Sequence, residues 1–309
     1  MFNETAKAVV SAGNLAKYDA QAKSVLADKN ILARILQRVV KEVQGMTIPE
    51  IISCIEGEPE ISTVPVDPGM TNARITGMPS ESNIVGENVV FFDIRFSILL
   101  PQGLKKIKLI INVEAQKKYN PGYHIVTRGI LYNARQLSMQ LGTEFQAPYY
   151  DDLKAVYSIW ICMDASQEAG NAITEYRITK NDILPGIKDT SENYDKSTVV
   201  VITLNEKKKS QDPFINMMNT LFSSSLDGEE KVRRLEETYG IPMKNKLEKE
   251  VKLMCNLSGY YLEVGIEQGI QLYRLLTENP EWDNERLSEE TGYSPDEVQK
   301  VREKIEKLK

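Results

Sequence analysis

Two acidic residues occupy matching places in a pair of apolar runs. Asp93 lies near the start of the run FFDIRFSILL and Glu114 near the end of IKLIINVEAQ, and the segment between the runs holds Pro101 and Gly103. Apolar runs joined by a short segment with Pro and Gly are typical of a β-hairpin. If the turn is centred between Gly103 and Leu104, Asp93 lies directly opposite Glu114.

This arrangement predicts a cation site. Carboxylates that face each other across two strands repel, and a bound cation relieves the repulsion. Gln116 shares a face with Glu114, because side chains two residues apart in a strand point the same way. Two carboxylates and an amide offer oxygen ligands suited to Mg²⁺, with Mn²⁺ as a substitute. The alternative is a solvated strand face on which Asp93 and Glu114 bind nothing.

The segments around the hairpin predict an α/β fold with a mixed sheet. Asp28 is the expected cap of a helix that ends at Gly45. The expected apolar positions of this helix are Ile31, Leu32, Ile35, Leu36, Val39, Val40 and Val43. A second short helix is expected to begin at Thr47. Further strands are expected near residues 61–66, 155–163, 172–179 and 198–204.

Residues 123–141 predict a helix that crosses the sheet between two parallel strands. Its expected buried positions are Ile125, Leu131, Ala134, Leu137 and Leu141. A polar stripe at spacings of three and four runs through His124, Arg128, Tyr132, Arg135 and Gln136. We expect this stripe to point toward the two carboxylates; the alternative is a solvated helix face.

The composition bounds the class of protein. The 309 residues are 41% hydrophobic and 27% charged, with a net charge of −6, which excludes a strongly basic protein that coats nucleic acid. The three cysteines, Cys54, Cys162 and Cys255, lack zinc-site spacing, and an odd, sparse count favours a reducing compartment. The sequence predicts no signal peptide and no membrane span, so we expect a cytoplasmic protein.

The hairpin residues resemble a known signature. Asp93 followed by Glu114-Ala115-Gln116 resembles the PD-(D/E)XK nuclease motif, with Gln in place of Lys. This variant is similar to the PD-(D/E)XK nuclease family transposases, also described as recombination-promoting nucleases. The likeness covers roughly residues 15 to 205. It includes the segments VPVDPGMTN (64–72), FFDIRF, LIINVEAQ, PGYHIVTRGILYNARQL (121–137) and YDDLKAVYSIWICMD (150–164).

The resemblance implies a Mg²⁺-dependent DNA endonuclease, a hydrolase of phosphodiester bonds, with an αβββαβ core. Asp93 and Glu114 would hold the metal, and Gln116 would orient a water molecule. Glu81, in GMPSES (77–82), resembles the family's further acidic residue; Glu87 is its rival, and a solvated loop glutamate is the alternative.

The resemblance also implies residues that contact the substrate. Arg128, Tyr132 and Gln136 match the family pattern Arg-x3-Tyr-x3-Gln. Arg128 would bind a phosphate, and either Arg128 or Lys118 would supply the charge that Gln116 lacks. The alternative function is a DNA-binding or helical interaction protein that keeps the nuclease fold without cleaving.

The nuclease-like domain is expected over residues 1–210, with its core at about 28–165, and a helical C-terminal extension over 211–309. Helices at Asn284–Thr291 and after Ser294 suggest a helix-turn-helix, but the last helix begins with acidic residues. The pattern therefore favours packing or oligomerisation, such as a homodimer, over reading of a DNA sequence.

Overall fold

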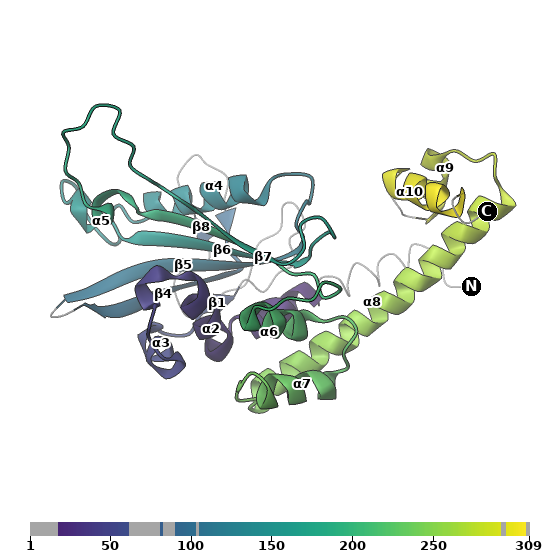
Figure 1. The fold of residues 1–309 in the computed structure, drawn as a ribbon, viewed down its shortest axis with the longest axis horizontal. Helices are drawn as coiled ribbons and strands as arrows, with labels where there is room; N and C mark the ends of the chain where they lie inside the picture. The colour runs from purple at the N-terminus through teal and green to yellow at the C-terminus, as the bar shows by residue number, and fades with distance from the viewer. Residues whose placement is uncertain (1–17, 62–80, 83–89, 103–104, 292–294, 307–309) are drawn as a thin grey trace. The chain divides into compact units, whose positions relative to one another are not determined.

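The computed structural model describes residues 18–61, 81–82, 90–102, 105–291 and 295–306. The chain divides into two compact units, Met1–Met254 and Cys255–Lys309. The first unit is a mixed α/β domain (Figure 1). Its residue range includes both Asp93 and Glu114.

A six-stranded mixed sheet, in the order β1-β4-β5-β6-β8-β7, forms the centre of the first unit. Its strands are β1 (Glu60–Ile61), β4 (Ile94–Gln102), β5 (Lys105–Lys118), β6 (Ala155–Asp164), β7 (Ala172–Arg177) and β8 (Ser197–Thr203). β5, β6 and β8 run parallel, whereas β1, β4 and β7 pair antiparallel to their neighbours. The expected α/β class is confirmed at this level.

The predicted hairpin is present as β4 and β5, and its register is the one expected. Ile94 pairs with Val113 and Gln102 pairs with Lys105, so the turn falls at residues 103–104, which lie outside the described residues. The expectation that Asp93 belongs to the strand is corrected, because β4 begins at Ile94. The preceding β3 (Val90–Phe91) pairs instead with β2 (Glu81–Ser82) in a separate two-stranded sheet.

Helices cover one face of the sheet with an apolar layer. Residues 18–26 are helical, and α2 (Lys29–Val39) follows the predicted cap, where Asp28 accepts a hydrogen bond from the Asn30 N–H at 2.8 Å. α2 ends earlier than predicted, at Val39, and Lys41–Val43 forms the 3-10 helix η1. α3 (Ile48–Cys54) begins with a capping box between Thr47 and Glu50.

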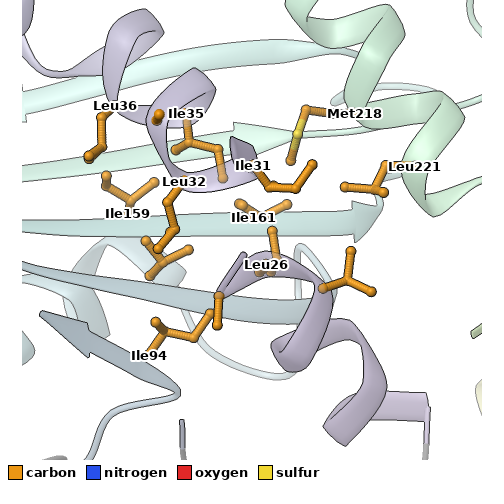
Figure 2. Packing of buried hydrophobic residues seen from close by; sticks show 14 of the residues in the cluster. Leu26, Ile31, Leu32, Ile35, Leu36, Ile94, Ile159, Ile161, Met218 and Leu221 are labelled. Atoms are coloured by element: carbon orange, nitrogen blue, oxygen red, sulfur yellow. The ribbon is translucent and has the colours of Figure 1, made fainter. Parts of the chain in front are cut away.

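The large core lies between these helices and the sheet. Leu32 and Ile35 of α2 pack with Ile159 of β6, and Met218 of α6 (Pro213–Phe222) joins the same cluster (Figure 2). Because α6 is part of this core, the first unit continues past the expected boundary at residue 210 to Met254. α7 (Gly228–Glu237) follows α6 in the same unit.

The opposite face is covered by α4 (Ile125–Ser138), which lies between β5 and β6 in the chain (Figure 1). Its predicted buried positions are corrected in part: Ile125 is buried as predicted and Leu137 is half-buried, but Ala134 is exposed. Leu131 and Leu141 are 52% and 56% exposed, whereas Tyr132, Asn133 and Gln136 are buried. Gly129 permits the close approach, since a Cβ at that position would lie 2.6 Å from a methyl group of Val199. Tyr132 and Gln136 of the polar stripe therefore face the sheet together with Ile125, whereas His124 is exposed.

The remaining short elements of the first unit are η2 (Tyr150–Asp152) and α5 (Ser191–Tyr194). α8 (Asn245–Glu278) begins in the first unit and continues into the second. The second unit also holds α9 (Asn284–Thr291) and α10 (Pro295–Glu306), as expected, with a small cluster of Leu272, Leu276, Leu287 and Val298. Its role in packing or oligomerisation stays a prediction.

In the parts of the chain that the structure describes, no helix has the length and apolar character needed to cross a membrane. The three cysteines are buried, and no disulfide joins them.

Candidate functional site

The carboxylates of Asp93 and Glu114 meet where β4 begins. The Asp93 N–H donates to Glu114 Oε1 at 3.1 Å, and the Ala115 N–H donates to Asp93 Oδ2 at 2.9 Å. Each side chain thus accepts a backbone hydrogen bond from the neighbouring chain segment. Asp93 is 9% exposed and Glu114 is 3% exposed. The two acids are adjacent as predicted, although a solvated strand face is excluded by their burial.

A lysine that the sequence analysis did not single out contacts Asp93. Lys23 Nζ lies 2.9 Å from Asp93 Oδ1 and 2.6 Å from Asp19 Oδ2, and the Lys23 side chain is 2% exposed. Burial alone would lower the pKa of Lys23, but the charges of Asp93 and Asp19 outweigh it and raise that pKa. The spacing of four between Asp19 and Lys23 was a readable signal of a helical ion pair.

Two neutral amides support Glu114. Asn112 Nδ2 donates to Glu114 Oε1 at 3.0 Å, and Gln136 Nε2 donates to Asn112 Oδ1 at 2.6 Å. Asn112 and Gln136 are both fully buried. Gln136 Oε1 has no hydrogen-bond partner among the described residues. Gln136 is thus buried against Asn112, and its predicted contact with substrate stays a prediction.

The surroundings of Glu114 favour its protonated form. Burial raises the pKa of Glu114 well above its usual value, and the nearby charge of Asp93 raises it further. The Asp93 N–H, the Arg128 guanidinium and the Asn112 amide oppose this rise. A cation at this carboxylate would therefore have to displace a proton as the pair becomes fully ionised.

Arg128 lies over aromatic rings on α4 and its neighbours. Its Nε and Nη2 lie 3.1 and 2.6 Å from the hydroxyl of Tyr132, and its Nη1 donates to the hydroxyl of Tyr123. The guanidinium carbon is 5.1 Å from the centre of the Tyr132 ring and 5.3 Å from that of Trp160. Tyr132 in turn packs edge-on against Phe92. Arg128 as a whole is half-buried.

Two further predicted residues, Gln116 and Lys118, lie near the end of β5. Gln116 is half-buried on β5, two residues after Glu114, in register with Cys162 of β6. Lys118 pairs with Asp164 in the same ladder, and its side chain lies outside the described residues.

The further acidic ligand stays a prediction. The backbone of Glu81 pairs with Phe91, two residues before Asp93, and its side chain lies outside the description, as does the whole of Glu87. Among the described residues, no three of the types His, Cys, Asp and Glu are grouped to hold a metal ion.

The donor atoms that are present suit a hard cation. Mg²⁺ usually binds to one or two carboxylates and keeps several water molecules, so Asp93 and Glu114 fit it without a third protein carboxylate. Zn²⁺ prefers nitrogen and sulfur ligands, and the buried Cys162 thiol, whose pKa burial raises to about 12, is a poor candidate for one. The chemistry of this pair therefore favours Mg²⁺ or Mn²⁺.

Comparisons with family models, with curated proteins and with solved structures found no match for this chain.

Proposed function

We propose that this protein is a Mg²⁺-dependent DNA endonuclease of the PD-(D/E)XK type, similar to the recombination-promoting transposases. The observation that carries the proposal is the pair of buried acids, Asp93 and Glu114, which lies where a β-hairpin adjoins a parallel strand; Glu114 accepts a hydrogen bond from the Asp93 N–H, and Asp93 accepts one from the Ala115 N–H. Two ionisable acids buried side by side are costly for the fold, and such pairs are common at functional sites. The half-buried Arg128 on the covering helix adds a donor for phosphate oxygens.

Asp93 and Glu114 would hold the metal ion, with the amide of Gln116 beside them. When bound, Mg²⁺ lowers the pKa of a water molecule and offsets the charge of the phosphate. Asn112 orients the Glu114 carboxylate, and Gln136 fixes which way the Asn112 amide points. Arg128 binds a phosphate oxygen and is held for this by Tyr132 and Tyr123. Gln116 orients water but brings no charge.

The direct test is cleavage of supercoiled plasmid by purified protein with Mg²⁺ and with a chelator. Wild type should cleave only with the metal, and Asp93→Asn and Glu114→Gln should each reduce cleavage to the level of the chelator control. Asp195→Asn is the matched control, because Asp195 is also a buried acid, paired with Lys41 at 2.8 Å and with Arg177, away from this pair. Cleavage that survives in Asp93→Asn or Glu114→Gln contradicts the proposal.

A second candidate is a protein that binds DNA through the same surface without cleaving it. The near-complete burial of Glu114, at 3% exposed, favours this alternative, because a metal ion needs access to the carboxylate. DNA binding that depends on Arg128, together with intact plasmid at every metal concentration, would support this candidate over the endonuclease.

A further inference from the structure

The side chain of Lys23 lies where a cation would compensate the acidic pair. It is 2% exposed and makes ion pairs of 2.9 Å with Asp93 and 2.6 Å with Asp19. Its helix, residues 18–26, buries Ala22, Val25 and Leu26 in the large core, on the opposite side of the sheet from α4. The ammonium therefore reaches Asp93 from a position that the core fixes.

The two oxygens of Asp93 both have partners. Oδ1 pairs with Lys23, and Oδ2 accepts the hydrogen bond from the Ala115 N–H. An incoming divalent cation at Asp93 would lie within a few ångströms of the ammonium of Lys23. Like charges at that separation repel strongly in a buried site, where the effective dielectric constant is low.

We propose that Lys23 is the resident counter-cation of the acidic pair, which holds Asp93 in the metal-free protein and opposes the binding of a divalent cation to the same carboxylate. Asp19 is the second partner that keeps the ammonium paired when Lys23 leaves Asp93. Lys23 thus sets the affinity of the site for its metal. The identity of the incoming ion rests on the proposed function, whereas the ion pair itself does not.

The test is a calorimetric titration of Mn²⁺ into wild type, Lys23→Met and Lys23→Arg, without DNA. Met keeps most of the length of Lys and removes the charge, so Lys23→Met should bind Mn²⁺ about tenfold more tightly or better, since the repulsion is gone. Lys23→Arg keeps the charge and should bind within about threefold of wild type. Unchanged or weaker binding by a folded Lys23→Met overturns the proposal.

Lys231→Met is the matched control for loss of a buried ammonium. Lys231 is 1% exposed and donates to the Ser223 carbonyl at 2.8 Å, on α7 rather than at the acidic pair. Its substitution should lower the melting temperature and leave the affinity for Mn²⁺ unchanged. An equal gain in affinity in Lys231→Met would mean that loosening of the fold, rather than the Lys23 charge, controls the metal.

Asp19→Asn tests the same claim, but here the affinity for Mn²⁺ is expected to fall. This variant replaces Lys23→Met in the experiment if Lys23→Met does not fold. Without the Asp19 charge, Lys23 has no second carboxylate to stabilise it away from Asp93. Mn²⁺ should therefore bind more weakly, by about threefold or more. Binding equal to or tighter than that of wild type contradicts the role of Asp19 as the second partner.

A metal-free experiment separates failure of this inference from failure of the proposed nuclease. In chelator, Asp93→Asn should partly restore the stability lost in Lys23→Met, because the double variant leaves no uncompensated Asp93 charge. Purely additive losses of stability overturn the role of Lys23 as counter-cation.

The binding and cleavage results together separate the two proposals. If wild type binds no Mn²⁺ and cleaves no plasmid while Lys23→Met binds Mn²⁺, the role of Lys23 as counter-cation is supported and the proposed nuclease activity is contradicted. If neither protein binds Mn²⁺, the opposition to metal is overturned.

Discussion

Asp93 and Glu114 carry the same kind of group, and each accepts a backbone hydrogen bond, Glu114 from Asp93 and Asp93 from Ala115, yet their surroundings differ. Asp93 contacts the ammonium of Lys23, which comes from the apolar side of the sheet. Glu114 accepts hydrogen bonds from the neutral amide of Asn112 and the Asp93 N–H, on the side that α4 covers. Asp93 has a direct ion pair, whereas Glu114 has neutral hydrogen-bond donors and the nearby charge of Arg128.

The difference shows how a fold can keep two acids together without a metal ion. A full counter-charge stabilises an ionised carboxylate directly, whereas neutral amides only reduce the cost of burying one. Burial accordingly raises the pKa of Glu114, despite its hydrogen bonds. We infer that Asp93 contributes to the stability of the metal-free protein, and that ionised Glu114 reduces it.

Asn112 provides the neutral side-chain amide that donates to Glu114. Asn112→Ala removes the amide that donates to Glu114 and leaves Gln136 Nε2 without its buried partner. We expect a loss of about 2 kcal/mol in the free energy of unfolding, since an unsatisfied buried polar group costs roughly 1–3 kcal/mol. Urea unfolding in chelator measures the loss.

The control is Asn133→Ala, since Asn133 is equally buried and bonds to Ser197 and Thr198 instead. Both variants should lose stability, but only Asn112→Ala should alter the pH dependence of unfolding, through Glu114. Equal pH profiles would show that Asn112 does not act on Glu114.

The next prediction concerns Arg128, the proposed contact with DNA phosphate. If Arg128 makes the proposed phosphate contact, Arg128→Ala should weaken DNA binding and reduce the slope of log K against log salt by about one, because that contact is lost. Arg38→Ala is the control, since Arg38 lies on α2, across the sheet, and pairs with Asp212. Binding measured by fluorescence anisotropy at several salt concentrations checks this. A change in melting temperature alone would make Arg128 a structural residue.

The smallest expected effect is on pH dependence. The folded pKa of Glu114 is raised, so its contribution to stability is complete below the unfolded value of about 4.3 and is lost as pH rises through the folded value. Glu114→Gln should remove the loss of stability that ionisation of Glu114 causes. At alkaline pH, the metal-free variant should therefore be more stable than wild type by a few tenths to about 1 kcal/mol. Asp19, whose pKa burial also raises, is common to both proteins. Thermal unfolding across pH in chelator would reveal no difference if Glu114 were solvated.

The hairpin register was predictable because it follows from local pattern. A strand alternates its side chains and a short turn leaves one pairing, so Asp93 and Glu114 were placed together before the fold was known. The start of β4 was less predictable. Asp93 lies just before β4, and its side chain accepts the Ala115 N–H; a tertiary contact of that kind has no sequence pattern.

The apolar pattern of α4 predicted only in part which of its residues are buried. Leu131 and Leu141 were expected to be buried, but Gln136 and Asn133 take the inner face. The sheet presents Asn112 and Glu114 there, and buried polar groups require polar partners. Of the polar stripe that was predicted to face the carboxylates, Gln136 reaches Glu114 through Asn112 and the charge of Arg128 acts on Glu114, whereas His124 is exposed. Lys23 was missed because the spacing from Asp19 indicates a helical pair but not that Asp93 completes it.

The central claim is that the two acids affect the metal-free fold in opposite directions. The most direct test measures the free energy of unfolding of Asp93→Asn and Glu114→Gln in chelator at one mildly alkaline pH. Asp93→Asn should be less stable than wild type, because the buried Lys23 loses a charged partner. Glu114→Gln should be as stable as wild type or more stable. A gain in Asp93→Asn, or a loss in Glu114→Gln as large as that in Asp93→Asn, would contradict the account.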